Sequence, residues 1–146
     1  MPLAPRVVLA DDERLARDIV AGVCARRGIP VLAMARDLHE LAALCAALRP
    51  DVVVTGDEVG GTPVAGSLQH LSAAGIRVIV VSAKHETCPL SVLAADSVWG
   101  HLSHDAPPDQ VADAILSVAD GHMALDRVTA TTVVRQWRRL RAGHQS

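Results

Sequence analysis

Residues 76–83 read IRVIVVSA, an almost unbroken run of β-branched apolar residues. A strand that is apolar on both faces is typical of the interior of a parallel sheet, where helices cover both sides. The run follows Gly75 and ends at Ser82 and Ala83, where a polar side chain replaces the apolar ones. It therefore predicts a central strand of an α/β protein, with candidate functional residues at its carboxyl end.

Further short apolar runs and helical patterns alternate on both sides of this strand. The other strands are expected at Arg6–Ala10, Val31–Ala35, Asp51–Thr55 and Ser97–Leu102. The helices are expected at Glu13–Arg27, Leu38–Leu48, Ser67–Ala74, Pro89–Ala95 and from Pro107 to near Gly121. The stretch between them at Gly56–Gly66 is rich in glycine and is expected to be a loop. Together these patterns predict a doubly wound, five-stranded parallel sheet of the flavodoxin-like (βα)5 type.

Composition restricts the class of protein. Half of the 146 residues are apolar, but none is Phe or Tyr, so an aliphatic core is expected. The net charge of -2 gives no general attraction to nucleic acid or to anionic membranes. No apolar run approaches the ~18–20 residues of a membrane span, and the N-terminus does not resemble a signal peptide, so we expect a cytoplasmic protein. Cys24, Cys45 and Cys88 are isolated, and the first two are expected to be small core residues.

Polar residues follow three of the predicted strands. Asp11 and Asp12 come after the first strand, Gly56 and Asp57 after the third, and Ser82 ends the fourth. The carboxyl ends of parallel strands meet at one edge of a sheet, so we expect these residues to lie together. Two adjacent carboxylates repel each other unless a cation stands nearby, and oxygen-rich sites suit Mg²⁺. Helix capping would explain one of the two aspartates, but not both.

At this point the chain resembles the receiver domain of response regulators of the NarL/FixJ type. The resemblance is carried by VVLADDE at 7–13, RPDVVV at 49–54, RVIVVSA at 77–83 and GHLSHDAPPDQVADAI at 100–115. The last segment is similar to a segment that opens the fifth helix in this family. That family segment reads glycine, an aromatic residue, two leucines, lysine, aspartate, alanine and proline. The resemblance implies a receiver-like domain at residues 4–124 and a linker or tail helix at residues 125–146.

The resemblance also implies a role for each polar residue at the strand ends. In typical receivers an acid pair holds Mg²⁺ and a third-strand aspartate accepts a phosphoryl group. A Ser or Thr bonds the phosphoryl oxygens, and a Lys ending the fifth strand neutralises them. Asp11 and Asp12 match the acid pair, and Ser82 matches the hydroxyl. The Pro-Asp pair at 50–51 sets the register of the third strand, which places Gly56 at the acceptor position.

Two histidines also depart from the family pattern. His104 stands at the lysine position, and His101 at the position of the aromatic residue that changes rotamer on activation. Histidine has an unperturbed pKa of about 6.5 and is only partly protonated near neutral pH. Alternation along a strand puts the two histidines on opposite faces, which argues against joint metal ligation. The two histidines and Gly56 together predict an atypical receiver. Such a receiver lacks its phosphoacceptor aspartate, because glycine occupies the acceptor position.

Asp57 offers the alternative of a working site that is displaced by one residue. Because side chains alternate across a strand, such a slip points the carboxylate to the other face. A bulge could re-aim it, and Gly56 is the residue type that permits one. On this hypothesis Asp57 accepts the phosphoryl group with Mg²⁺. A third hypothesis is a small-ligand site in the pocket that the glycine and the histidine vacate beside Ser82.

The missing aspartate also determines the expected cofactor. The third-strand carboxylate is normally a direct ligand, so Asp11 and Asp12 alone are expected to hold Mg²⁺ weakly at most. No other cofactor is expected. Since a receiver without its acceptor cannot transfer a phosphoryl group to itself, no catalytic residue and no enzymatic activity are expected. We expect signalling by protein contact instead, as the regulatory part of a transcription regulator or as a stand-alone adaptor.

The segment after Gly121 predicts a helix with an apolar stripe and a basic remainder. The stripe consists of Val133, Val134, Trp137 and Leu140, and the basic residues are Arg135, Arg138, Arg139 and Arg141. The favoured interpretation is that the stripe packs on the receiver. A second chain on the stripe, or nucleic acid on the arginines, remains open. No membrane contact and no DNA-binding domain are expected in this chain.

A partner surface is expected from the resemblance. The face formed by the fourth helix, the fifth strand and the fifth helix is the usual partner surface of receivers, and the tail helix offers a second. Either surface could hold a protein partner or a second copy of the chain. The region of His101, Val98, Leu102 and Ala112 could contribute to the first of these faces, although the sequence does not show which of these residues are exposed.

Overall fold

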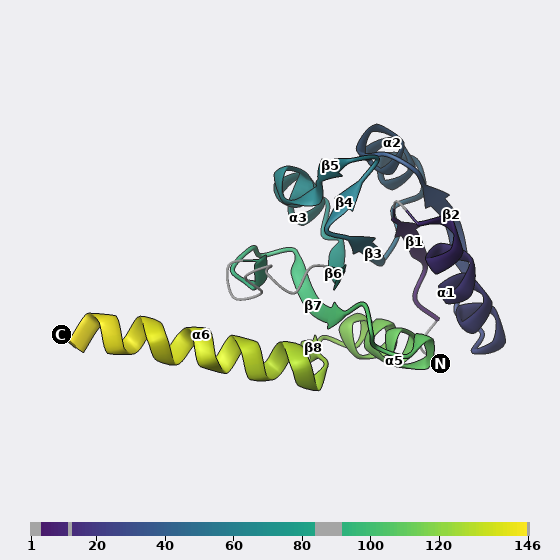
Figure 1. Cartoon of the computed structure of the whole chain (residues 1–146). Helices are drawn as coiled ribbons and strands as arrows, with labels where there is room; N and C mark the ends of the chain where they lie inside the picture. The colour runs from purple at the N-terminus through teal and green to yellow at the C-terminus, as the bar shows by residue number, and fades with distance from the viewer. Residues whose placement is uncertain (1–3, 12, 84–91, 146) are drawn as a thin grey trace.

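The computed structural model describes residues 4–11, 13–83 and 92–145, and its centre is a parallel sheet. The strand order is β2-β1-β3-β6-β7-β8, with every neighbouring pair parallel (Figure 1). The strands are β1 (Val7–Ala10), β2 (Val31–Ala35), β3 (Val52–Gly56), β6 (Arg77–Ser82), β7 (Val98–Ser103) and β8 (Ala124–Leu125). The doubly wound α/β fold predicted from the sequence is confirmed.

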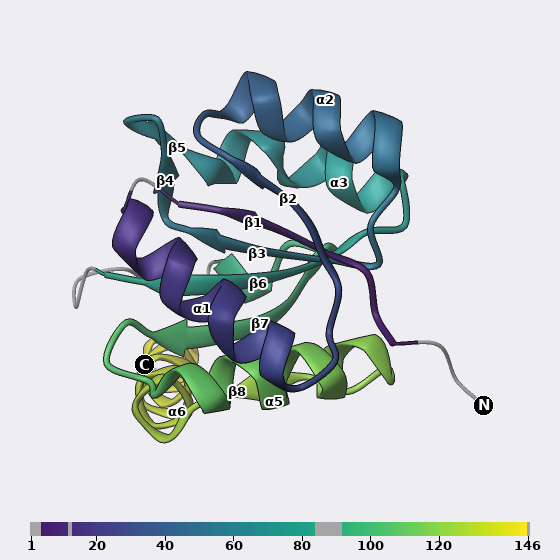
Figure 2. The same ribbon diagram turned by 90° about the vertical axis from the view of Figure 1, so that its right-hand side faces the viewer.

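Helices cover both faces of this sheet, as Figure 2 shows. The helices are α1 (Arg14–Arg26), α2 (Leu38–Leu48), α3 (Leu68–Ala73), α5 (Pro108–Ala119) and α6 (Arg127–Gln145). Alternate residues of β1 serve the two faces: Val7 and Leu9 pack with α1 and α5, whereas Val8 and Ala10 pack with α2 and α3. This alternation explains why the strands are apolar throughout their length.

Two features differ from the sequence prediction. The two-residue strand β8 adds a sixth strand beside β7. The expected loop Gly56–Gly66 contains the antiparallel pair β4 (Glu58–Val59) and β5 (Thr62–Pro63), followed by the 3-10 helix η1 (Val64–Ser67). Strands of two residues are too short to show an alternating pattern, so sequence periodicity does not reveal them. Of the helix predicted at Pro89–Ala95, residues 89–91 lie outside the described residues, and Val92 and Leu93 are helical.

Two further expectations concern the burial of the cysteines and the lack of a membrane-spanning segment. Cys24 and Cys45 are buried and free, which confirms them as core residues, and burial raises the pKa of Cys45 to about 11. Cys88 lies outside the described residues. Within the described part of the chain, no helix combines the length and the apolar character that crossing a membrane requires.

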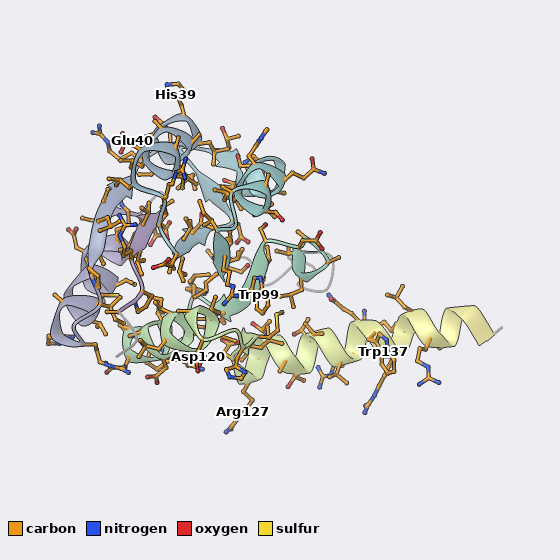
Figure 3. All side chains as sticks on the ribbon, turned by 180° about the vertical axis from the view of Figure 1, so that it is seen from behind. His39, Glu40, Trp99, Asp120, Arg127 and Trp137 are labelled. Atoms are coloured by element: carbon orange, nitrogen blue, oxygen red, sulfur yellow. The ribbon has the colours of Figure 1, made fainter. Side chains whose placement is uncertain are left out.

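The C-terminal helix α6 projects away from the body of the domain (Figures 1 and 3). Val134, Trp137 and Leu140 are 44%, 49% and 57% exposed. The favoured prediction that the apolar stripe packs on the receiver is therefore wrong. The pattern of a stripe shows that a helix has an apolar face, but it does not show what covers that face.

Candidate functional site

The carboxyl ends of β1 and β3 open into a cavity of about 350 Å³. Its lining includes Asp11, Gly56, Asp57 and His104, so four of the residues singled out in the sequence share one site. Asp12, the second member of the predicted acid pair, lies outside the described residues. The expected gathering of polar side chains at one edge of the sheet is thus found for the residues that the structure describes.

Gly56 is the last residue of β3 and is buried. It pairs with Val81 of β6 in a register that runs without a shift from Val52. A Cβ added at Gly56 would stand 3.2 Å from Oδ1 and 3.3 Å from Cγ of Asp11. A side chain at this position would therefore point at the Asp11 carboxylate, into the acidic side of the cavity.

Asp57 follows directly and turns into the same site. Its Oδ2 accepts a hydrogen bond from Ser82 Oγ at 2.9 Å and another from the backbone N–H of Ala83 at 3.1 Å. The bulge that the sequence suggested as a way to re-aim Asp57 is not found in the pairing of β3 with β6. The regular pairing ends at Gly56 and the chain bends at Asp57, so strand alternation no longer decides where this side chain points.

The two histidines lie in different surroundings. His104 is about half exposed, and its Nε2 lies 3.2 Å from Oδ1 of Asp105. His101 is 3% exposed, and its Nδ1 lies 3.4 Å from Oγ1 of Thr129 in α6. The expectation that the two rings do not share a ligand agrees with this geometry.

Burial lowers the pKa of His101, and the nearby charges of Asp57 and Asp126 oppose that shift. The ring is therefore neutral near pH 7. Its Nε2 has no hydrogen-bond partner among residues 4–11, 13–83 and 92–145. A buried ring nitrogen without a partner is disfavoured by roughly 1–3 kcal/mol, so packing against the first turn of α6 must hold the ring in place.

Asp126 is a functional candidate that the sequence reasoning missed. This residue is 6% exposed and precedes α6. Its Oδ1 accepts from the N–H of Thr129 at 2.8 Å, and its Oδ2 accepts from the N–H of Ser103 at 2.7 Å. The first bond is an N-cap, whereas the second ties the start of α6 to the end of β7. An aspartate three residues before Thr129 was the available signal for the cap, but nothing local indicated the bond to Ser103.

Burial would raise the pKa of Asp126, but the hydrogen bonds from Thr129 and Ser103 and the nearby His101 bring it below its usual value. The lowered pKa means that these donors stabilise the ionised carboxylate more than burial disfavours it. Asp126 is therefore a charged anchor for the helix at neutral pH.

The described residues do not form a dedicated metal site. No group of three His, Cys, Asp or Glu side chains among them is placed to hold a metal ion. Asp11 supplies a carboxylate, but its Oδ1 already accepts from the N–H of Glu13 at 3.2 Å, and Gly56 supplies no ligand. Weak Mg²⁺ binding by Asp11 and Asp12 stays a prediction.

The expected partner face is corrected in one respect. His101, Val98, Leu102 and Ala112 are all at most 3% exposed. Because β7 lies between β6 and β8 and is covered by α5 and the start of α6, these side chains belong to the interior. They offer no surface to a partner in this state of the chain.

The arrangement of the sheet and its helices is that of response-regulator receiver domains. The chain is similar to a LuxR-family two-component response regulator from Aurantimonas sp. SI85-9A1, with 22% identity, a TM-score of 0.81 and coverage of 92% of this chain and 98% of that one. The signal receiver domain of a response regulator, NarL, from Mycobacterium tuberculosis gives 26% identity and a TM-score of 0.75, covering 83% of this chain and all of that one.

A third similar structure belongs to a longer protein. The response regulator ChrA of a heme-sensing two-component system is 26% identical with a TM-score of 0.72, and the match covers 91% of this chain but 65% of ChrA. No family model matches the chain, and no curated protein does. The structural likenesses therefore establish the receiver fold.

Proposed function

We propose that this chain is an atypical receiver that signals through protein contacts without phosphorylation of an aspartate. The observation that carries the proposal is the pair of hydrogen bonds from Ser82 Oγ and the Ala83 N–H to Asp57 Oδ2. In the receivers that the chain resembles, the hydroxyl at the Ser82 position bonds phosphoryl oxygens. Here a carboxylate oxygen of the chain itself takes that place.

The missing side chain at Gly56 supports the same interpretation. An acceptor aspartate there would point at Asp11, as the 3.2 Å approach of a Cβ to Asp11 Oδ1 shows. Without it, this position has no nucleophile. His104 stands where the family has its lysine, and its ring lies 3.2 Å from Asp105 and is about half exposed. Asp57 then holds Ser82 in one arrangement, and no transferred group is needed to do so.

The contact partner is proposed to be a protein. The structural neighbours include LuxR-family response regulators, which supports a role as the regulatory part of a cytoplasmic transcription regulator. Figure 1 shows that helix α6 projects from the body beside α5, and we propose these two helices as surfaces for such a partner. Because α6 is exposed along most of its length, we favour the tail helix.

Mass spectrometry of the intact protein after incubation with acetyl phosphate and Mg²⁺ tests the proposal. We expect no phosphoryl adduct on the wild-type chain, on Asp57→Ala or on the control Asp105→Ala. An adduct that is present in the wild type and in Asp105→Ala but lost in Asp57→Ala would refute the proposal. That result would make Asp57 the acceptor of a receiver that uses Mg²⁺.

The cavity supports a second candidate function, the binding of a small molecule. Its volume of about 350 Å³ lies within the usual range for ligand sites, about 300–1,000 Å³. Ile19, Val20 and Val111 contribute apolar wall, and Asp11 and Asp57 contribute polar groups. A thermal-shift screen of metabolites tests this function: a compound that raises the melting temperature of the wild type, but not of Val111→Phe, would support it. No shift with any compound would count against it.

A further inference from the structure

A groove runs between helices α2 and α3, on the face of the sheet opposite α1 and α5. Figure 2 shows these two helices side by side, and the groove between them has a volume of about 600 Å³. Its α2 wall is formed by Leu38, Leu41, Ala42, Cys45, Ala46 and Arg49. These residues have the spacing of a single helix face, so the groove follows α2 for about 16 Å.

The groove is open because alanines stand where the two helices face each other. Four exposed lining residues have side chains that end at Cβ: Ala42, Ala46, Ala73 and Ala74. Buried apolar side chains close the floor: Leu41, Cys45, Leu71 and Ile76. Burial raises the pKa of Cys45 to about 11, so its thiol is neutral and adds only apolar surface. The groove is therefore an apolar channel that the chain itself leaves unfilled.

The polar residues that line the groove are basic or neutral. They are Ser67, His70 and Arg49, and none of the described lining residues is acidic. Glu40, the acidic residue of α2, does not line the groove, and its Oε2 lies 3.5 Å from Nη2 of Arg36. Arg49 follows the last turn of α2, and its guanidinium forms no hydrogen bond or ion pair within residues 4–11, 13–83 and 92–145. The apolar channel thus has a cation at one end that no described carboxylate neutralises.

Arg49 occupies a backbone conformation that favours glycine. Its φ is 47° and its ψ is 64°, and it is the one non-glycine residue with a positive φ among the described residues. Glycine adopts this conformation without steric cost, whereas a residue with a Cβ is disfavoured there. Strained residues of this kind gather at ligand sites. What arginine adds at this position is its side chain, which lines the groove.

These features fit a slender apolar molecule that carries one carboxylate. The volume of about 600 Å³ lies within the usual range for small ligands, about 300–1,000 Å³. Two turns of a partner helix, about 10 Å across and about 11 Å long, would occupy about 800 Å³, so a helix could not lie within the groove. An extended alkyl chain advances about 1.3 Å per bond, so a chain of about 12 carbons spans the length of α2.

We infer that the groove between α2 and α3 binds a fatty acid. Its alkyl chain lies between the alanine walls, and its carboxylate accepts paired hydrogen bonds from the guanidinium of Arg49. A cationic head group would be repelled by the same arginine. This inference goes beyond the proposed function and does not rest on it, because the groove shares no lining residue with the cavity at the carboxyl ends of the strands.

Isothermal titration of the full chain tests the charge of the ligand. The probes are dodecanoate and dodecyltrimethylammonium, each below its critical micelle concentration, which have the same alkyl chain and opposite head-group charges. We expect saturable binding of dodecanoate at one site and no saturable binding of dodecyltrimethylammonium. A wild type that does not bind dodecanoate would overturn the inference, and so would equal affinity for the two probes.

Two tryptophan variants test the location of the site. Ala46→Trp fills the groove, whereas Ala47→Trp places the same side chain at the next residue of α2, which is also exposed but does not line the groove. We expect Ala46→Trp to abolish binding and Ala47→Trp to leave the Kd unchanged. Circular dichroism establishes that both variants are folded. Equal loss of binding in both variants, or binding that survives Ala46→Trp, would overturn the inference.

Replacement of Arg49 tests the contact with the carboxylate. Arg49→Gly removes the guanidinium and relieves the backbone, so this variant should be at least as stable as wild type. We expect it to raise the Kd for dodecanoate at least about tenfold, and Arg49→Lys to recover part of that loss. An unchanged Kd in Arg49→Gly would overturn the role of the arginine and with it the choice of a carboxylate.

The outcome is distinguishable from the tests of the proposed function. Val111→Phe fills the cavity at the carboxyl ends and should leave dodecanoate binding unchanged. If Val111→Phe abolished the binding and Ala46→Trp did not, the fatty acid would lie in that cavity and the inference would be overturned. A chain that binds no fatty acid leaves the phosphorylation-independent function intact, and an adduct on Asp57 leaves the groove intact.

Discussion

Replacing Asp126 by alanine should detach the start of α6 from the domain. The carboxylate is buried and accepts from the N–H of Thr129 at 2.8 Å and from the N–H of Ser103 at 2.7 Å. Loss of an N-cap costs about 0.5–2 kcal/mol, and loss of a hydrogen bond to a charged group costs about 1.5–3 kcal/mol. We therefore expect Asp126→Ala to lower the free energy of unfolding by about 3 kcal/mol.

Thermal unfolding followed by circular dichroism measures this loss. For a chain of this size, about 3 kcal/mol corresponds to a fall in Tm of roughly 6–12 °C. Asp120→Ala is the matched control, because that aspartate is 84% exposed and precedes the same segment. Amide hydrogen exchange at Ser103 and Thr129 locates the effect. Both amides should exchange faster in Asp126→Ala than in wild type, and their exchange rates should be unchanged in Asp120→Ala.

The pH dependence of the same loss follows from the lowered pKa of Asp126. A carboxyl group whose pKa is lower in the folded chain stabilises that chain above its unfolded pKa of about 3.9, and the contribution fades as the pH falls through the folded pKa. The difference between wild type and Asp126→Ala should stay constant from about pH 5 to 8 and shrink below about pH 4. The reasoning would be refuted if the free energy of unfolding of Asp126→Ala lay within about 0.5 kcal/mol of the wild-type value at pH 7 and the amide exchange of Ser103 were unchanged.

The other predictions concern the interior and the cavity. Burial lowers the pKa of His101, so wild-type stability should fall as the pH drops below about 6.5, and chemical denaturation of His101→Phe should show a flatter profile. Gly56→Asp should lower stability by about 1–2 kcal/mol through repulsion by Asp11, and Mg²⁺ should raise the Tm of this variant but not of wild type. Arg77→Ala should lower the free energy of unfolding by about 2 kcal/mol, because the guanidinium lies 4.5 Å from the centre of the Trp99 ring and donates hydrogen bonds to two carbonyls of α5. Arg77→Lys should recover only part of that stability in the same denaturation assay.

The fold could be predicted from the sequence because its long elements have strong patterns. Strands such as Arg77–Ser82 are apolar on both faces, and the helices between them have apolar residues at helical spacing. The two-residue strand β8 and the β4–β5 pair were not predictable, since a pattern needs several residues to be visible. Local pattern therefore predicts the layers of the fold but not its shortest strands.

The candidate site was predictable in its members but not in its geometry. The register of β3 placed Gly56 beside the acidic side chains, and the approach of its Cβ position to Asp11 agrees with that placement. The direction of Asp57 was not predictable, because the chain leaves the strand at this residue and bends toward Ser82. The bond between Asp126 and Ser103 joins residues 23 apart, and no local signal specifies such a contact.

His101 packs against the tail helix, and its position bears on how firmly that helix is held. The charges of Asp57 and Asp126 both oppose the lowering of the His101 pKa by burial, and the ring is packed against Thr129. In the receivers that the chain resembles, an aromatic residue at this position changes rotamer on activation.

Here the first turn of α6 covers the ring, so rotation requires the helix to leave β7. That movement would break the hydrogen bond from the Ser103 N–H to Asp126, at a cost of about 1.5–3 kcal/mol, whereas the N-cap bond to Thr129 moves with the helix. A free-energy gap of this size keeps the undocked state below about 10% of the population. We infer that His101 and the first turn of α6 are held together in a single arrangement, and that Asp126→Ala is the variant that would let His101 move. If the ring of His101 stays as protected from solvent in that variant as in wild type, Asp126 does not control its position.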